Sequence, residues 1–287
     1  MSTKQNGPLS PQDISDFVGR RDDMALELST FRALLGNGWW ANHGGFYRDP
    51  VQDKFRQFDV QGGLELRKNP NTPLLPTTGI RVAAECKNLS PEAPIVVSRM
   101  PRTENESYHC LLKRITDRGN VKAVKEVRVI RSTAFDAKPY HSGVPVGKSI
   151  VQYQKNPAAK APDDPYAKWS QALSSCATQI IQAYTKAIVN PEAPDLCFIF
   201  PALIVADATL WVVDYDKDGV RGGPQLADEA TLFLGQFYDV DVEGGKQRYG
   251  VSHLHIYTET GLANALPTWN RLRHSKEWER VYKFGCN

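Results

Sequence analysis

An acid and a base stand two positions apart in the segment GIRVAAECKN, residues 79–88. Side chains alternate between two faces along a β-strand, so Glu85 and Lys87 are predicted to share one face with Arg81 and Ala83. The intervening valine, alanine and cysteine side chains make the other face apolar. The segment is therefore predicted to be a strand that buries one face and ends the other in a carboxylate and an ammonium group.

A second carboxylate stands upstream, at Asp59 in KFRQFDVQ. We predict that Asp59 lies in the middle of a strand that ends at a Gly62-Gly63 turn. Strands adjacent in sequence usually pair, so Asp59 and Glu85 can converge. Two close carboxylates repel unless a cation lies between them, and hard oxygen ligands favour magnesium or manganese. Lys87 would then contact the attacking water or the scissile phosphate. An exposed cross-strand salt bridge is the alternative interpretation.

A helix is predicted before these strands. The helical pattern begins at Ser10-Pro11 and continues through DDMALELSTFRALLGNG, where glycines end it. Its predicted apolar stripe consists of Met24, Leu28, Phe31 and Leu35. Glu27 lies one position off this stripe. On this pattern alone Glu27 is either a surface carboxylate with an apolar stem or a functional acid, and the former is favoured.

The rest of the chain predicts the elements that would support such a site. A helix is expected from Asp163-Asp164-Pro165, with an apolar stripe from Trp169 to Ile188 that should pack on a sheet. Strands are expected at LCFIFPALIVA, TLWVVDYD and RYGVSHLHIYTET, and helical character in the last segment, GLANALPTWNRLRHSKEWERVYKF. The fold class predicted is α/β: one domain over residues 1–287, with a mixed central sheet flanked by helices and a basic, loop-rich insertion at about 88–164.

Composition and charge favour a soluble protein that binds a polyanion. The chain of 287 residues is 41% hydrophobic and 23% charged, and its net charge of +3 argues against a histone-like or membrane-adsorbed protein. Residues 99–168 hold 14 lysines and arginines against 7 acidic residues, a local charge of +7. This surplus suits nucleic acid, although a solvated surface would look similar. The candidate nucleic-acid contacts are Lys122, Lys125, Arg128 and Lys148.

The location predicted from the sequence is cytoplasmic, without membrane contact. The N-terminal residues MSTKQNGPLSPQD lack the apolar region of a signal peptide, and no apolar run reaches the roughly 20 residues that a spanning helix needs. The 5 cysteines show no CxxC spacing and are expected to be reduced and mostly buried.

Three further motifs are interpreted as structural. DYDKDG, residues 214–219, begins like an EF-hand loop, but its twelfth position is Gln225 where a glutamate is needed, so a hairpin turn is predicted. GVPVGKS, residues 143–149, is one residue too short between its glycines for a phosphate-binding loop, although Lys148 can still contact a phosphate. His253 and His255 share a strand face, but no cysteine or acid stands at metal-ligand spacing beside them.

The order of the first features resembles the PD-(D/E)XK nuclease superfamily, which has the restriction-endonuclease-like fold. The resemblance rests on Glu27 in a helix ending LLGNGWW, then FYRDPVQDKFRQFDVQ, then VAAECKN, and covers roughly the first third of the chain. It implies that Asp59 and Glu85 bind metal, that the backbone carbonyl of Cys86 and the Glu27 carboxylate add ligands, and that Lys87 assists the water. Phe58 stands where the family motif has proline.

What the resemblance implies is a magnesium-dependent phosphodiesterase, with manganese as a substitute, that hydrolyses nucleic acid, with DNA favoured over RNA. It further implies a role in restriction or antiphage defence, as a homodimer or a subunit of a larger defence complex. Two alternatives stay open: a catalytically silent nucleic-acid-binding or assembly module with the same fold, and a scaffold with an accidental motif in which the carboxylates do not converge.

Overall fold

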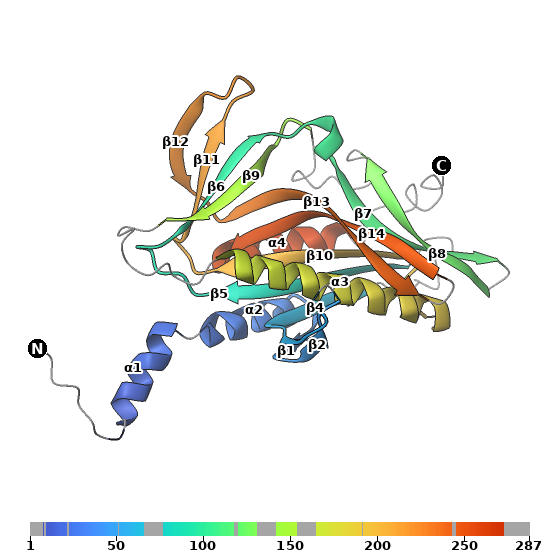
Figure 1. Ribbon diagram of the computed structural model, residues 1–287, viewed down its shortest axis with the longest axis horizontal. Coiled ribbons are helices and arrows are strands. Elements are labelled where there is room, and N and C mark those ends of the chain that lie inside the picture. The colour runs from blue at the N-terminus through green and yellow to red at the C-terminus, as the bar shows by residue number, and fades with distance from the viewer. Residues whose placement is uncertain are drawn as a thin grey trace, which may run out of the picture.

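The computed structural model describes residues 8, 10–21, 23–50, 52–65, 77–117, 120–130, 142–153, 165–190, 192–242 and 245–272 (Figure 1). The expected helix start at Asp163-Asp164 and the helical character expected after residue 272 lie outside these residues.

Four α-helices are described: α1 (Pro11–Arg21), α2 (Met24–Gly36), α3 (Pro165–Val189) and α4 (Glu259–Leu272). The strands of the first half are β1 (Trp40–His43), β2 (Phe46–Arg48), β3 (Phe55–Gln57), β4 (Val60–Glu65), β5 (Thr78–Lys87), β6 (Ile95–Pro101), β7 (Tyr108–Asp117) and β8 (Asn120–Ile130). Those of the second half are β9 (Pro145–Gln152), β10 (Leu196–Val205), β11 (Leu210–Tyr215), β12 (Arg221–Leu226), β13 (Glu229–Val242) and β14 (Gly245–Thr258). A 3-10 helix, η1 (Glu104–Glu106), precedes β7.

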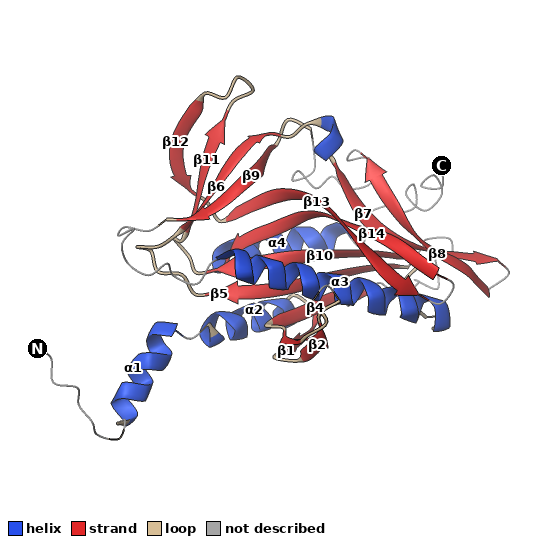
Figure 2. Cartoon of the chain, in the orientation of Figure 1, coloured by secondary structure: helices blue, strands red, loops and turns tan. Residues whose placement is uncertain are grey.

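The predicted mixed central sheet is confirmed. Its strand order is β1-β4-β5-β10-β14-β13-β9-β6-β11-β12, and the β7–β8 hairpin joins it through β10 (Figure 2). The centre is parallel, because β10 pairs in parallel with both β5 and β14, whereas β4 runs antiparallel to β5. The short strands β2 and β3 form a separate hairpin.

Helices cover both faces of the sheet centre, with α3 on one side and α2 and α4 on the other (Figure 1). Every residue of β10 is buried, as expected for a parallel strand covered on both faces. In β5 both faces are buried up to Cys86, so the prediction of one buried face there was too narrow. No described helix combines the length and apolar character needed to span a bilayer.

The predicted Gly62-Gly63 turn is wrong, because both glycines lie inside β4. They allow close packing across the strand. A Cβ atom on Gly62 would lie 2.9 Å from Leu34 Cδ1, and one on Gly63 would lie 2.6 Å from the Trp40 ring. Glycine here marks close approach of neighbouring side chains instead of chain reversal.

The predicted helix before the strands is two helices, and the stripe predicted in the second is wrong. The buried residues of α2 are Leu26, Thr30 and Leu34, whereas Met24 and Leu35 are 44% and 46% exposed. The face of α2 that contains Leu34 is buried because Leu34 packs against the backbone of Gly62, which has no side chain to keep it away. This orientation places Glu27 at the edge of the buried face.

The predicted loop-rich insertion at 88–164 is also wrong for its described part, which forms β6, β7, β8 and β9. Their charged residues interrupt the alternating apolar pattern by which strands are predicted from sequence. In β7, Arg114 can be buried because its guanidinium forms an ion pair with Asp195 at 3.0 Å.

The strands expected at β10, β11 and β14 are confirmed, as is the hairpin turn between β11 and β12. Helix α3 begins at Pro165 and buries its predicted stripe from Leu173 to Tyr184, but Ile188 is 38% exposed.

Candidate active site

Asp59 and Glu85 lie side by side at one end of the β4–β5 pair. The antiparallel register joins Val60 to Ala84, so Asp59, one residue before β4, lies beside the end of β5. The backbone N–H of Cys86 donates a hydrogen bond to Asp59 Oδ2 at 2.8 Å. The predicted convergence of the two carboxylates is confirmed, and the separation expected of a scaffold with an accidental motif is not seen.

The Glu85 carboxylate is fully buried. Among the described residues, neither of its oxygens makes a hydrogen bond of good geometry, and the hydrogen-bonding groups that face it are the side chain and backbone of Asp59. Burial, followed by the negative charge of Asp59, raises the pKa of Glu85 well above its ordinary value. A buried carboxylate without well-placed donors is costly, and a cation beside it lowers that cost.

Lys168, from the first turns of α3, supplies a cation at this point. Its Nζ atom lies 3.1 Å from Asp59 Oδ2 and 3.9 Å from Glu85 Oε2. Burial alone would lower the pKa of Lys168, but the charges of Asp59 and Glu85 together raise it. Lys168 is therefore an ammonium ion between two acids. The sequence reasoning missed it, because its only signal is its place immediately before the apolar stripe of α3.

Lys87 reaches the same cluster through Asp23. Its Nζ atom lies 3.9 Å from Asp23 Oδ2, the same oxygen that lies 3.9 Å from Lys168 Nζ. Asp23 also accepts a hydrogen bond from the backbone N–H of Asn88 at 2.6 Å. This aspartate, which sequence reasoning also missed, is the N-cap residue of α2 and ties that helix to the end of β5.

The two further ligands predicted are the Glu27 carboxylate and the backbone carbonyl of Cys86, and both stay predictions. The Glu27 carboxylate contacts His43 Nε2 at 2.7 Å, and burial and the charge of Asp59 raise the pKa of Glu27. The Cys86 thiol points to Thr30 Oγ1 at 3.6 Å, and burial raises its pKa well above the ordinary value. Within the described part of the chain, no group of three or more histidine, cysteine, aspartate and glutamate side chains is arranged to hold a metal ion.

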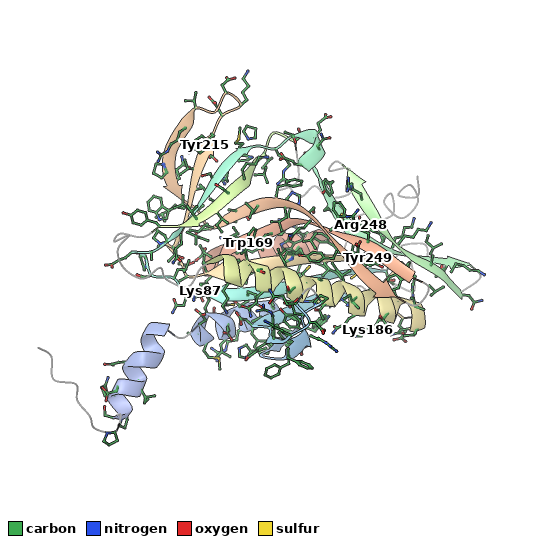
Figure 3. All side chains as sticks on the ribbon, viewed as in Figure 1. Lys87, Trp169, Lys186, Tyr215, Arg248 and Tyr249 are labelled. Atoms are coloured by element: carbon green, nitrogen blue, oxygen red, sulfur yellow. The ribbon has the colours of Figure 1, made fainter. Side chains whose placement is uncertain are left out.

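Lys122, Lys125 and Arg128 are exposed on β8, far from the carboxylates. The β7–β8 hairpin joins β10 at Leu196, whereas Lys87 pairs at Val205, nine residues further along β10. At about 3.3 Å per residue this separation is about 30 Å. In Figure 3, Lys87 and Lys186, which is on the last turn of α3, lie toward opposite ends of that helix. The basic strand is therefore not beside the acidic pair.

The remaining predicted residues have separate positions. Lys148, on β9, forms an ion pair with Glu106. His253 and His255 are buried among aromatic rings, including Phe233 beside His253 and Phe200 beside His255.

The chain matches no protein-family model, no curated protein and no solved structure. A function for it has to be inferred from the geometry of Asp59, Glu85 and the lysines around them.

Proposed function

We propose that this protein is a magnesium-dependent nuclease, with manganese as a substitute, that hydrolyses phosphodiester bonds in nucleic acid, DNA in preference to RNA. The observation that carries the proposal is the Glu85 carboxylate: fully buried, beside a second acid and 3.9 Å from the Lys168 ammonium group. Burial of such a group costs free energy of folding, and a strongly perturbed carboxylate beside a second acid is a candidate cation ligand.

The donor set fits a hard divalent cation. Asp59 and Glu85 would hold it, because carboxylate oxygens are the ligands that magnesium prefers. The bound ion would supply an activated water and stabilise the negative charge that develops on the phosphate. Burial fixes the Glu85 side chain, and the Cys86 N–H orients that of Asp59. Glu27 and the Cys86 carbonyl are proposed as additional ligands in the restriction-endonuclease-like core.

The two lysines have distinct roles in this proposal. Lys168 balances the charges of Asp59 and Glu85, and so holds both carboxylates in place when no metal is bound. Lys87, at the partly exposed end of β5, would contact the phosphate oxygens of the substrate. Both ammonium groups would stabilise the negative charge of the transition state.

A catalytically silent binding or assembly module is the second candidate. It is favoured by Lys168 itself, because an ammonium ion already neutralises the acids, and by the lack of a three-ligand group among the described residues. Action on foreign DNA in the cytoplasm, as a homodimer or within a larger defence complex, is an extension of the nuclease proposal.

Cleavage assays separate the two candidates. Plasmid, linear duplex and single-stranded DNA and RNA would be incubated with magnesium, manganese or EDTA. We expect cleavage with either metal, none in EDTA, and none by Asp59→Asn or Glu85→Gln. Glu65→Gln is the matched control, because Glu65 lies at the far end of β4, where it pairs with Arg81 at 3.1 Å.

Full activity in EDTA would eliminate the metal mechanism. Binding without cleavage of any substrate, unchanged in Glu85→Gln, would favour the silent module.

A further inference from the structure

A cleft of about 480 Å³ opens between α3, β9 and β13. Its origin lies in the sheet, because β9 and β13 pair only at Gly147 and Leu232 and separate beyond that point. Next to this point β13 has a bulge between Phe233 and Gln236, where Gly235 adopts a φ of 57°. Bulges often redirect side chains beside functional sites.

The walls of the cleft combine aromatic rings with hydrogen-bonding groups. Trp169, Phe233 and Tyr238 supply rings, Gln236 and Gln52 supply amides, and Lys148 supplies an ammonium group. The Tyr238 hydroxyl donates to Gln236 Oε1 at 3.1 Å, which orients that amide. The volume lies within the range of about 300–1,000 Å³ typical of small-molecule sites.

The cleft adjoins the candidate active site through two elements. Trp169 and Ser170 in its wall directly follow Lys168, whose Nζ contacts Asp59. Gln52 belongs to the turn of the β2–β3 hairpin, and the Tyr47 hydroxyl of that hairpin donates to the Gln171 carbonyl of α3 at 3.3 Å. A ligand in the cleft would therefore lie along the same helix as the carboxylate site.

We propose that this cleft binds one unstacked nucleobase of the substrate, beside the phosphate that is cleaved. The inference rests on the proposed nuclease function and specifies how the substrate is held. Aromatic rings stack on bases of any sequence, and amides pair with base edges. Lys148, which Glu106 holds at the wall, suits the phosphate of the same nucleotide.

The test uses the four deoxynucleoside 5′-monophosphates as probes, titrated by calorimetry against the full chain in EDTA. We expect at least one of them to bind, and Gln236→Ala to weaken that binding about tenfold or more through loss of a base-edge contact. Gln225→Ala is the matched control, because Gln225 is an exposed glutamine on the distant strand β12. Ser170→Trp should block the cleft and abolish binding, with folding checked by circular dichroism.

Absence of binding by all four probes, or equal binding by Gln236→Ala and Gln225→Ala, would overturn the inference. Because these titrations need neither metal nor cleavage, nucleotide binding in the cleft by a protein that cuts nothing would refute the nuclease and leave the base site standing. Cleavage of DNA by a protein that binds none of the four nucleotides would support the nuclease and refute the base site.

Discussion

At the scale of single residues, the site depends on how opposite charges are distributed. Two lysines lie within 3.9 Å of Asp23, and Lys168 Nζ also lies 3.1 Å from Asp59 Oδ2 and 3.9 Å from Glu85 Oε2. The two side chains are similarly exposed, 21% for Lys168 and 17% for Lys87, but the charges of Asp59 and Glu85 raise the pKa of Lys168. The two lysines should therefore respond differently to truncation.

Lys87→Ala should lower the cleavage rate by about 10²- to 10³-fold and leave nucleic-acid binding intact, because one electrostatic stabiliser of the transition state is lost. Lys168→Ala should lower the rate similarly and also destabilise the metal-free protein, because a buried pair of acids loses its cation. Single-turnover cleavage and urea unfolding in EDTA measure the two effects.

Lys186→Ala is the control, since Lys186 lies at the other end of α3 (Figure 3). A Lys87→Ala protein that cuts at the parental rate would show that Lys87 has no catalytic role.

Residue types and spacing were enough to predict the pair of Asp59 and Glu85, because adjacent strands usually pair. They were not enough to find Lys168, which is 83 residues beyond Glu85 and reaches it only because α3 crosses β5. Asp23 was missed for a similar reason: its role depends on where α2 starts relative to the end of β5.

At the scale of elements, the close contact of α2 and β1 with β4 positions Asp59. This contact depends on Gly62 and Gly63, against which Leu34 and Trp40 pack. This contact was not predicted from the sequence, because a glycine pair usually indicates a turn. The strands in 88–164 were missed because charged side chains such as Arg114 are buried by partners that only the fold supplies.

Gly63→Ala should lower the free energy of unfolding by about 1–3 kcal/mol, because the new methyl group would overlap the Trp40 ring. Gly223→Ala on β12 should change it by less than about 0.5 kcal/mol, since no atom lies within 4 Å of that Cβ position. Denaturant unfolding compares the two variants. Equal effects would mean that β4 tolerates a side chain at this point and that the glycines serve another purpose.

A second prediction at the scale of elements follows from the position of β8. Charge reversal of Lys122, Lys125 and Arg128 together should weaken nucleic-acid binding and make its salt dependence shallower by up to about three units of log–log slope, because counterion release falls. The cleavage rate at saturating substrate should not change, because β8 lies at the other end of β10 from the carboxylates. Unchanged affinity and slope would assign β8 to solvated surface.

At the scale of the whole molecule, three buried histidines make stability depend on pH. Burial, with neighbouring positive charge, lowers the pKa of His109 and His255 to about 3 and that of His253 well below its ordinary value. The unfolded chain binds protons at these groups below about pH 6.5, whereas the folded chain does not until about pH 3. Their contribution to stability is therefore complete above pH 6.5 and is lost as the pH falls toward 3.

We expect the free energy of unfolding to fall by up to about 1.4 kcal/mol per pH unit for each histidine in this window. The measurement is denaturant unfolding at pH 7, 6 and 5. In a His109→Asn variant, the pH dependence of the free energy of unfolding should be smaller by the contribution of one histidine, up to about 1.4 kcal/mol per pH unit. Identical slopes for the variant and the parent would contradict the assignment of His109 to a neutral, buried state.

The parallel pairing of β5 with β10 has a consequence for synthesis on the ribosome. Thr77 and Asp195, which hydrogen-bond where these strands begin to pair, are 118 positions apart. The strand that carries Glu85 leaves the ribosome long before its central neighbour exists, and α3, with Lys168, is made in between. A nascent chain that ends before β10 would hold its acids on an unpaired strand edge, which is prone to wrong pairing. The carboxylate pair can therefore acquire its buried form only after β10 has been translated, so the proposed nuclease activity should appear only late in synthesis.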